Sequence, residues 1–207
     1  MTAGRVIRSF AAPGLLSFGL AWDGARLWVQ DDVSNLIYQL DPVTARVLRS
    51  FTQPHADITG ICVVPGRNLY AVSSSANLVY EVDIVTGRTL RSFSTPAADC
   101  YDMAWDGRYL WLVSDGANLI YQLDLATGQA IRSLTALGVY PRGVACNGRT
   151  LFHAPFDGPI YEIDPVTDRT IRSFTSPTTS LYALAWDGAR LWVLSAVANM
   201  VYQVEVS

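Results

Sequence analysis

Apolar residues occur along this chain in short runs that turn-forming residues interrupt at regular intervals. Early in the chain the runs cover 15–22, 26–30, 36–41 and 47–51, and they are rich in the aromatic and β-branched residues that strands favour. The breaks between them include Asp23-Gly24 and Pro42-Val43-Thr44, which favour turns. No stretch keeps the 3.6-residue apolar period of a helix. The pattern predicts four short strands in this segment.

The same pattern recurs along the whole chain, and the string Arg-Ser-Phe after an aliphatic residue marks each copy. It stands at 7–10, 48–51, 90–93 and 171–174, and 131–134 is an altered fifth copy. The arginines are 41, 42, 41 and 40 residues apart, a period typical of four-stranded propeller blades. A parallel β-helix has shorter coils, and a helical solenoid needs a helical period. We therefore predict an all-β, five-bladed β-propeller with units at about 11–51, 52–93, 94–134, 135–174 and 175–207.

The two ends of the chain predict how the ring closes. A four-residue turn between the third and fourth strands would place Tyr38 opposite Arg49. The same count gives the other pairs: Asp41 with Arg46, Asp83 with Arg88, Asp164 with Arg169, Tyr80 with Arg91, Tyr121 with Arg132 and Tyr161 with Arg172. Tyr202 and Glu205 have no following strand, and residues 5–10 supply the missing arginines, Arg8 and Arg5. We expect residues 5–10 to complete the last blade, which closes one domain over 1–207 and removes two open sheet edges.

Composition excludes several classes of protein. All 15 basic residues are Arg and the net charge is −3, so a nucleic-acid binder, which needs a basic surplus, is disfavoured. No apolar run is long enough to span a bilayer, and the start of the chain does not read as a secretory signal, so we expect a cytoplasmic protein or a piece of a longer one. Cys62, Cys100 and Cys146 are odd in number and lie at non-equivalent positions, which favours buried reduced thiols.

Three units end their first run with Ala-Trp-Asp-Gly, at 21–24, 104–107 and 185–188, and Ile-Tyr-Gln-Leu-Asp-Pro follows at 37–42. In these WD-like motifs the chain resembles, over its whole length, bacterial propellers of the YVTN and streptogramin-lyase-like superfamily. That resemblance implies the fold and no single activity, because the superfamily mixes enzymes and binding modules.

The blades also resemble, more weakly, those of the five-bladed glutaminyl cyclases, which convert N-terminal Gln to pyroglutamate. The resemblance implies that activity would use a Glu and a Lys near Trp residues at the channel mouth. This chain has no Lys, and Glu81, Glu162 and Glu205 fall on predicted third strands, away from the channel. The chain therefore lacks, at the expected positions, the catalytic residues that the resemblance to glutaminyl cyclases implies.

In propellers of this type, ligands usually meet the face formed by two sets of loops. One set joins each outer strand to the next inner strand, here at 11–17, 52–57, 94–100, 135–141 and 175–180; the other joins second to third strands, at 30–35, 73–77, 114–118, 154–159 and 195–199. With the first residues of the inner strands, these loops, called the acidic face below, hold Asp31, Asp32, Asp57, Asp99, Asp102, Asp115 and Asp157. Arg142 is the one Arg among them, so the local field favours a cation, a metal or a basic peptide, although Asp is also common in turns.

Two positions on the inner strands depart from the repeat. Asp102 stands where the other units have Gly or Ala, so its carboxylate could hold water or an axial cation such as Ca²⁺, or be capped by amides. Arg142 stands where the others have Phe18, Thr59, Tyr101 and Tyr182, a set that could line a pocket mouth. Trp residues at repeated positions, and His153, are expected to serve core packing. His55 and Cys100 share the acidic face without a spacing that assembles a hydrolase site.

Together these observations favour a monomeric, non-catalytic binding or scaffold propeller without a required cofactor. Its expected ligand-binding residues are Asp31, Asp32, Asp57, Asp99, Tyr101, Asp102, Arg142, Asp157 and Tyr182, with Asp102 as the metal candidate. The alternative is an enzyme of glutaminyl-cyclase or lyase type acting at the channel mouth. The similarity of the units is compatible with recent duplication, a fragment of a larger array or deliberate engineering.

Overall fold

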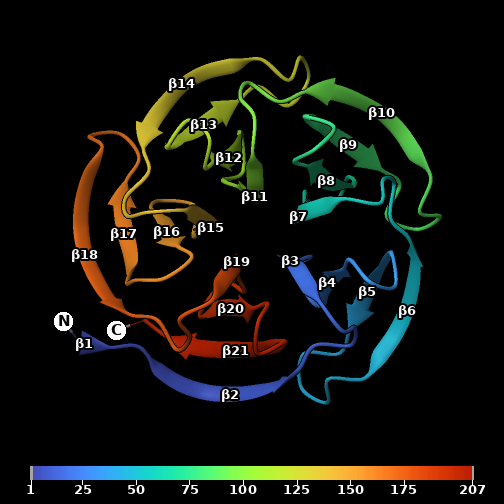
Figure 1. Ribbon diagram of the computed structural model, residues 1–207, viewed down its shortest axis with the longest axis horizontal. Helices are drawn as coiled ribbons and strands as arrows, with labels where there is room; N and C mark the ends of the chain where they lie inside the picture. The colour runs from blue at the N-terminus through green and yellow to red at the C-terminus, as the bar shows by residue number, and fades with distance from the viewer. Residues whose placement is uncertain (1, 207) are drawn as a thin grey trace.

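A computed structural model describes residues 2–206 and confirms the predicted five-bladed β-propeller, with blades arranged in a ring around a central axis (Figure 1). Blade 1 contains β3 (Ser17–Trp22), β4 (Leu27–Asp31), β5 (Leu36–Leu40) and β6 (Val47–Thr52). Blade 2 contains β7 (Ile58–Val63), β8 (Leu69–Ser73), β9 (Leu78–Val82) and β10 (Thr89–Ser94). Blade 3 contains β11 (Cys100–Trp105), β12 (Leu110–Ser114), β13 (Leu119–Leu123) and β14 (Ala130–Thr135). Blade 4 contains β15 (Pro141–Cys146), β16 (Leu151–Pro155), β17 (Ile160–Asp164) and β18 (Arg169–Thr175).

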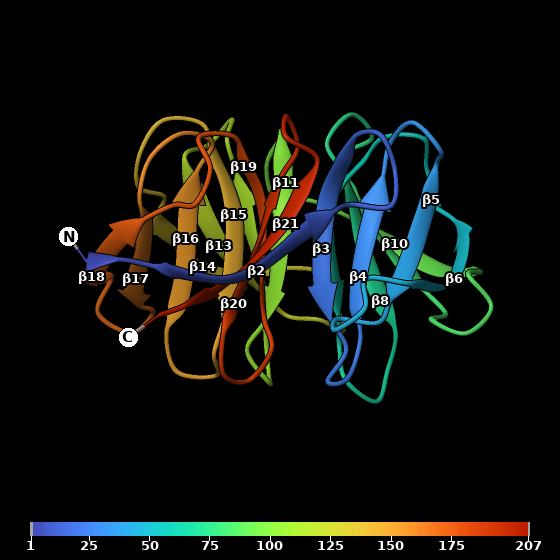
Figure 2. The ribbon, with the colours of Figure 1, turned by 90° about the horizontal axis from the view of Figure 1, so that it is seen from below.

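Blade 5 is built from both ends of the chain, as predicted. It combines β19 (Leu181–Trp186), β20 (Leu191–Ser195) and β21 (Met200–Glu205) with the N-terminal β2 (Arg5–Ala11) as its outer strand. The expected pair of Arg5 and Glu205 forms an ion pair of 2.8 Å. A two-residue strand, β1 (Thr2–Ala3), runs parallel to β18, so the N-terminal segment also contacts blade 4. Figure 2 shows β2 crossing the side of the ring while the inner strands follow its axis.

The core lies between neighbouring blades, where each cluster of buried apolar side chains draws on two of them. Trp28, Trp111 and Trp192 on the second strands are the largest fully buried side chains. Their indole N–H groups donate to the Asp of the preceding turn, at 2.8–2.9 Å: Asp23, Asp106 and Asp187. Each of these carboxylates also accepts backbone N–H groups of its own turn, so the Asp-Gly turn and the core Trp hold each other in place. Within residues 2–206, no helix is long and apolar enough to cross a membrane.

The predicted cross-strand pairs of Tyr with Arg are wrong by one residue. Tyr38 faces Ser50, and Arg49 lies opposite Gln39, because the ladder shifts register between Gln39 and Leu40. The same shift pairs Arg91 with Glu81, Arg132 with Gln122, Arg172 with Glu162 and Arg8 with Gln203. A β-bulge adds one residue on one strand, and counting outward from the turn does not reveal it. The predicted facing of Asp41 and Arg46 holds only for the backbone, since the Asp41 carboxylate binds amides of its own turn and Arg26.

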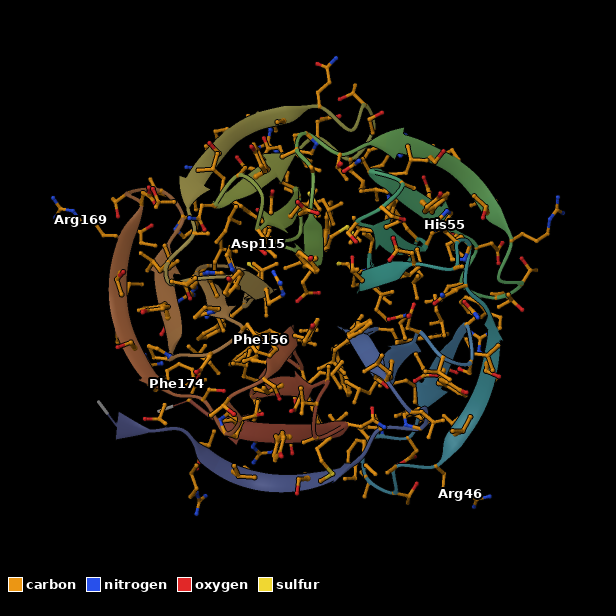
Figure 3. The ribbon with its side chains drawn as sticks, in the orientation of Figure 1. Arg46, His55, Asp115, Phe156, Arg169 and Phe174 are labelled. Atoms are coloured by element: carbon orange, nitrogen blue, oxygen red, sulfur yellow. The ribbon has the colours of Figure 1, made fainter. Side chains whose placement is uncertain are left out.

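In blades 1, 2 and 5 the repeated Arg of the outer strand connects its blade to the next one. The guanidinium of Arg49 donates to the carbonyl oxygens of Ile84 and Val85, which lie in the turn between the third and fourth strands of blade 2. Arg91 makes the equivalent bonds to Leu125 and Ala126 of blade 3. Arg8 of the closing strand donates to Pro42 of blade 1. The most regular motif of the sequence thus joins blades along the rim, where Arg46 and Arg169 instead extend outward (Figure 3).

Candidate functional site

The five innermost strands place equivalent side chains in layers along the axis. Each strand carries a bulge near its start, and the bulged residues form the first layer, at the acidic face: Phe18, Thr59, Tyr101, Arg142 and Tyr182. The second layer is Gly19, Gly60, Asp102, Gly143 and Ala183. The fourth layer is Ala21, Cys62, Ala104, Ala145 and Ala185, and the fifth is Trp22, Val63, Trp105, Cys146 and Trp186. Bulges re-aim side chains and are common beside functional sites, so the first layer marks a candidate binding mouth.

The two predicted sets of loops meet on one face, where backbone hydrogen bonds join them. In blade 1 the Asp32 N–H donates to the Leu16 carbonyl at 2.9 Å, and in blade 3 the Asp115 N–H donates to the Asp99 carbonyl at the same distance. Equivalent bonds occur in blades 4 and 5. In Figure 3, Asp115 and Phe156 lie around the central opening, and His55 lies farther out.

Arg142 lies in a cage of aromatic rings and one carboxylate. Its guanidinium carbon is 3.6 Å from the ring centroid of Tyr101, 5.8 Å from that of Tyr182 and 6.0 Å from that of Tyr140. Its Nη1 donates to Asp115 at 2.8 Å, and both side chains of this ion pair are largely buried. Stacking on rings and pairing with a carboxylate are the contacts that bind guanidinium groups well. The sequence predicted Arg142, Tyr101 and Tyr182 at one mouth, but not the part played by Asp115.

Aromatic contacts continue across the mouth from this cage. Phe18 stacks on Tyr182 with centroids 4.7 Å apart, and Phe156 meets the edge of Tyr182 at 5.6 Å. These rings come from blades 1, 4 and 5. The mouth is therefore lined by aromatic surface on one side of the axis.

The predicted acidic residues occupy three different environments. Asp31 is fully buried, and its carboxylate accepts the Leu16 and Ser34 N–H groups at 2.7 and 2.8 Å, so it holds loops together and does not face a ligand. Asp57 accepts the Ser75 N–H at 2.8 Å and remains partly exposed, while Asp99 and Asp157 are exposed. Burial, with the negative charges of Asp57 and Asp31, raises the pKa of Asp32.

Asp102 is buried in the second layer, below the mouth. Its Oδ2 accepts the N–H groups of Val144 and Leu184, each at 3.0 Å, so one side chain links β11 to β15 and β19. Burial raises the pKa of this carboxyl well above its usual range, against the opposing effect of those bonds. Oδ1 has no hydrogen-bond partner within residues 2–206, and across the same residues no three His, Cys, Asp or Glu side chains gather as a metal site. An axial cation at Asp102 stays a prediction.

The remaining titratable groups near this face are separated from one another. The Nδ1 of His55 lies 3.4 Å from the Ser73 hydroxyl, and the ring stacks on Tyr80. Burial raises the pKa of Cys100 to about 11, which keeps its thiol protonated. His153 is enclosed between the carbonyl oxygens of Gly143 and Leu137, and burial lowers its pKa to about 4. These positions do not bring a nucleophile, a base and an orienting group together.

A second concavity, which the sequence analysis missed, opens at the opposite end of the channel. This cavity, called the lower well below, has a volume of about 150 Å³ and receives residues from all five blades. Half-buried Trp22, Trp105 and Trp186 stand around it. The sequence signal was the Trp of Ala-Trp-Asp-Gly, which ends an inner strand in three of the five blades. The expected core packing holds for these three as well, because each packs against a buried apolar cluster, but unlike the fully buried Trp28, Trp111 and Trp192 they also line the well.

Comparison with known proteins shows the fold and no more. The chain matches no known family profile and no curated protein sequence, so membership of the YVTN superfamily is not shown. A crystal structure of glutaminyl cyclase from Myxococcus xanthus superposes with a TM-score of 0.80 and 13% identity, covering 98% of this chain and 96% of that one. A chain in a crystal structure of the mitotic checkpoint complex superposes with a TM-score of 0.62 and 17% identity, covering 93% of this chain and 63% of that one.

Proposed function

We propose that this propeller is a non-catalytic binding module that recognises a basic peptide segment on its acidic face. The observation that carries the proposal is the cage around Arg142: its guanidinium lies over Tyr101 and pairs with Asp115, so the mouth already holds a cationic group of this chemistry. Neighbouring rings and carboxylates offer the same contacts to Arg or Lys side chains of a partner.

Charge on the same face supports a cationic partner. Asp32, Asp57, Asp99 and Asp157 have no ion-pair partner within residues 2–206, and Asp57 contributes to the raised pKa of Asp32. A cation bound between Asp32 and Asp57 would relieve their repulsion. A peptide fits better than a metal ion, because the carboxylates are spread over several blades and do not converge.

The experiment measures the affinity of an Arg-rich peptide for the native protein and for the double variant Asp32→Asn/Asp57→Asn. Exposed ion pairs contribute about 0.2–1 kcal/mol each, so the affinity should fall roughly 2- to 30-fold and the native affinity should weaken as salt is added. Asp83→Asn is the matched control: its carboxylate lies in the turn between β9 and β10 and accepts the Val85 and Thr86 N–H groups, which the side-chain oxygen of Asn can also accept. Equal losses in the two variants would contradict the assignment to the acidic face.

The structural similarity to glutaminyl cyclase supports a second candidate function, that of an enzyme of cyclase or lyase type that acts at the channel mouth. All three Glu residues lie on third strands and are paired with outer-strand arginines: Glu81 with Arg91, Glu162 with Arg172 and Glu205 with Arg5. These pairings oppose the cyclase function. Turnover of a peptide with N-terminal Gln, together with no binding of the Arg-rich peptide, would replace the first proposal by the second.

A further inference from the structure

The lower well has the shape and lining of a small-molecule site that is separate from the acidic face. Its lining includes the small side chains of the fourth layer and the larger apolar side chains of Leu20, Ile61, Met103 and Leu184. Trp22, Trp105 and Trp186 with Val63 and Cys146 stand nearer the opening, at the rim, together with Gly24 and Pro65. Asp102 crosses the axis above it by binding the amides of Val144 and Leu184. The well therefore has its opening on the face opposite the acidic one.

The lining fits an uncharged occupant. Among residues 2–206, no charged side chain lines the well. Burial raises the pKa of Cys146 to about 11 and that of Cys62 further, so both thiols are neutral at physiological pH. A charged ligand would lose its hydration here without gaining a counter-charge.

The volume of the well limits the size of the ligand that it can hold. The volume of about 150 Å³ equals that of an engineered apolar cavity that stays dry and binds benzene. A single aromatic ring fills such a space, whereas a drug-sized ligand needs a pocket of roughly 300 Å³ or more.

The rim tryptophans differ from the core tryptophans in a way that suits a ligand. The indole N–H groups of Trp28, Trp111 and Trp192 are bound to Asp residues. Within residues 2–206, those of Trp22 and Trp105 have no such acceptor, and neither has that of Trp186, whose ring stacks on Phe152 at 5.4 Å. A rim indole can therefore offer its ring edge or face to an aromatic ligand and donate a hydrogen bond to an oxygen on it.

We propose that the lower well binds one free, uncharged, monocyclic aromatic molecule of about the size of a phenol. Binding there is independent of the acidic face, because none of the first-layer residues that form the acidic mouth lines the well. A ligand of so few atoms should bind with a Kd on the order of 1 mM or tighter.

The test uses p-cresol as the probe and the indole N–H resonances of the full chain as the readout. The protein has six Trp, so six indole signals are observed and assigned by substitution. Saturable shifts of the signals of Trp22, Trp105 and Trp186, with those of the three core tryptophans unchanged, support the proposal. No shift at millimolar p-cresol, or equal shifts of all six signals, overturns it.

Ligand and variant controls make the assignment specific. Benzoate and benzylammonium carry a charge on a ring of similar size and should bind at least tenfold more weakly to the well. Trp105→Val introduces the residue that blade 2 has at this position, Val63, and should weaken p-cresol binding about tenfold. Arg142→Gln, at the opposite mouth, should leave p-cresol binding unchanged; a matching loss in that variant would overturn the separation of the two sites.

The p-cresol experiment and the peptide experiment test the two proposals separately, so either proposal can fail while the other holds. If p-cresol binds to the lower well and the Arg-rich peptide does not bind to the acidic face, the proposal for the well stands and the peptide-binding proposal fails. An N-acetylated phenylalanine amide serves as a further arm: if it binds the well more tightly than p-cresol does, the occupant is an aromatic side chain of a partner and the free-ligand proposal is wrong.

Discussion

Asp102 offers a sharp test of how the blades are held together at the axis. Its Oδ2 accepts the N–H groups of Val144 and Leu184 at 3.0 Å each, and all three residues are buried. Asp102→Ala leaves both N–H groups without an acceptor. An unmet buried polar group costs about 1–3 kcal/mol, so the variant should lose about 2–6 kcal/mol of stability.

Asp102→Asn is the matched control, because its side-chain carbonyl can accept both N–H groups without carrying a proton. Burial raises the pKa of Asp102 in the folded protein well above that of the unfolded chain. The stability that the neutral carboxyl contributes is then fully present below the unfolded pKa of about 3.9 and is lost as the pH rises through the folded pKa. The Asn variant does not suffer this loss, so its advantage over the native protein should grow as the pH rises above about 4.

The assay is urea unfolding followed by Trp fluorescence at several pH values, with the native protein, Asp102→Ala and Asp102→Asn. We expect the Ala variant to be much less stable than the Asn variant at every pH. We expect the Asn variant to be at least as stable as the native protein at pH 7. Equal stabilities of the Ala and Asn variants would refute the idea that the two amides depend on this side chain.

Three further outcomes follow from the structure. Gly60→Ala should be more destabilising than Gly143→Ala, by thermal unfolding, because its new Cβ would meet the backbone of the next inner strand whereas Gly143 faces flexible Leu side chains; overpacking alone costs about 1–3 kcal/mol. Deletion of residues 1–10 should lower the melting temperature and produce oligomers in gel filtration, since blade 5 loses its outer strand; an unchanged monomer would contradict the observed closure. Asp57→Asn should lower the pKa of Asp32, measured by NMR titration, because one of the charges that raise it is gone; an unchanged pKa would mean that the charge of Asp57 does not contribute and that burial and Asp31 account for the shift.

The fold could be predicted from the period of the repeat. Four short strands in about 40 residues, repeated five times, are typical of a propeller, in which the sheets form a closed ring. Strand register was harder to predict. The extra residue of the bulge in blade 1 is Leu48 on the outer strand, opposite the step from Gln39 to Leu40, and its residue type does not distinguish it from a regular strand position. As a result, the Tyr partners of the arginines were wrong by one position.

The sequence indicated which residues lie on the acidic face, but not how deeply each side chain is buried or what it binds. Asp31 and Asp32 are neighbours in one loop, yet one is buried under amide donors and the other is partly exposed. Both environments suit an Asp in a turn, so the sequence could not separate them. The lower well was missed because Ala and Trp at the end of an inner strand also serve ordinary packing, and only the register of five strands brings them around one axis.

The pairing of β2 with β21 has a consequence for how this chain is made. Arg5 and Glu205 are 200 residues apart, so at a synthesis rate of about 5–20 residues per second β2 waits roughly 10–40 s for its partner. During that time four blades can form on the ribosome while an unpaired strand stays available to other chains. Closure is then the last step, and delay at that step exposes the molecule to exchange of β2 between two copies.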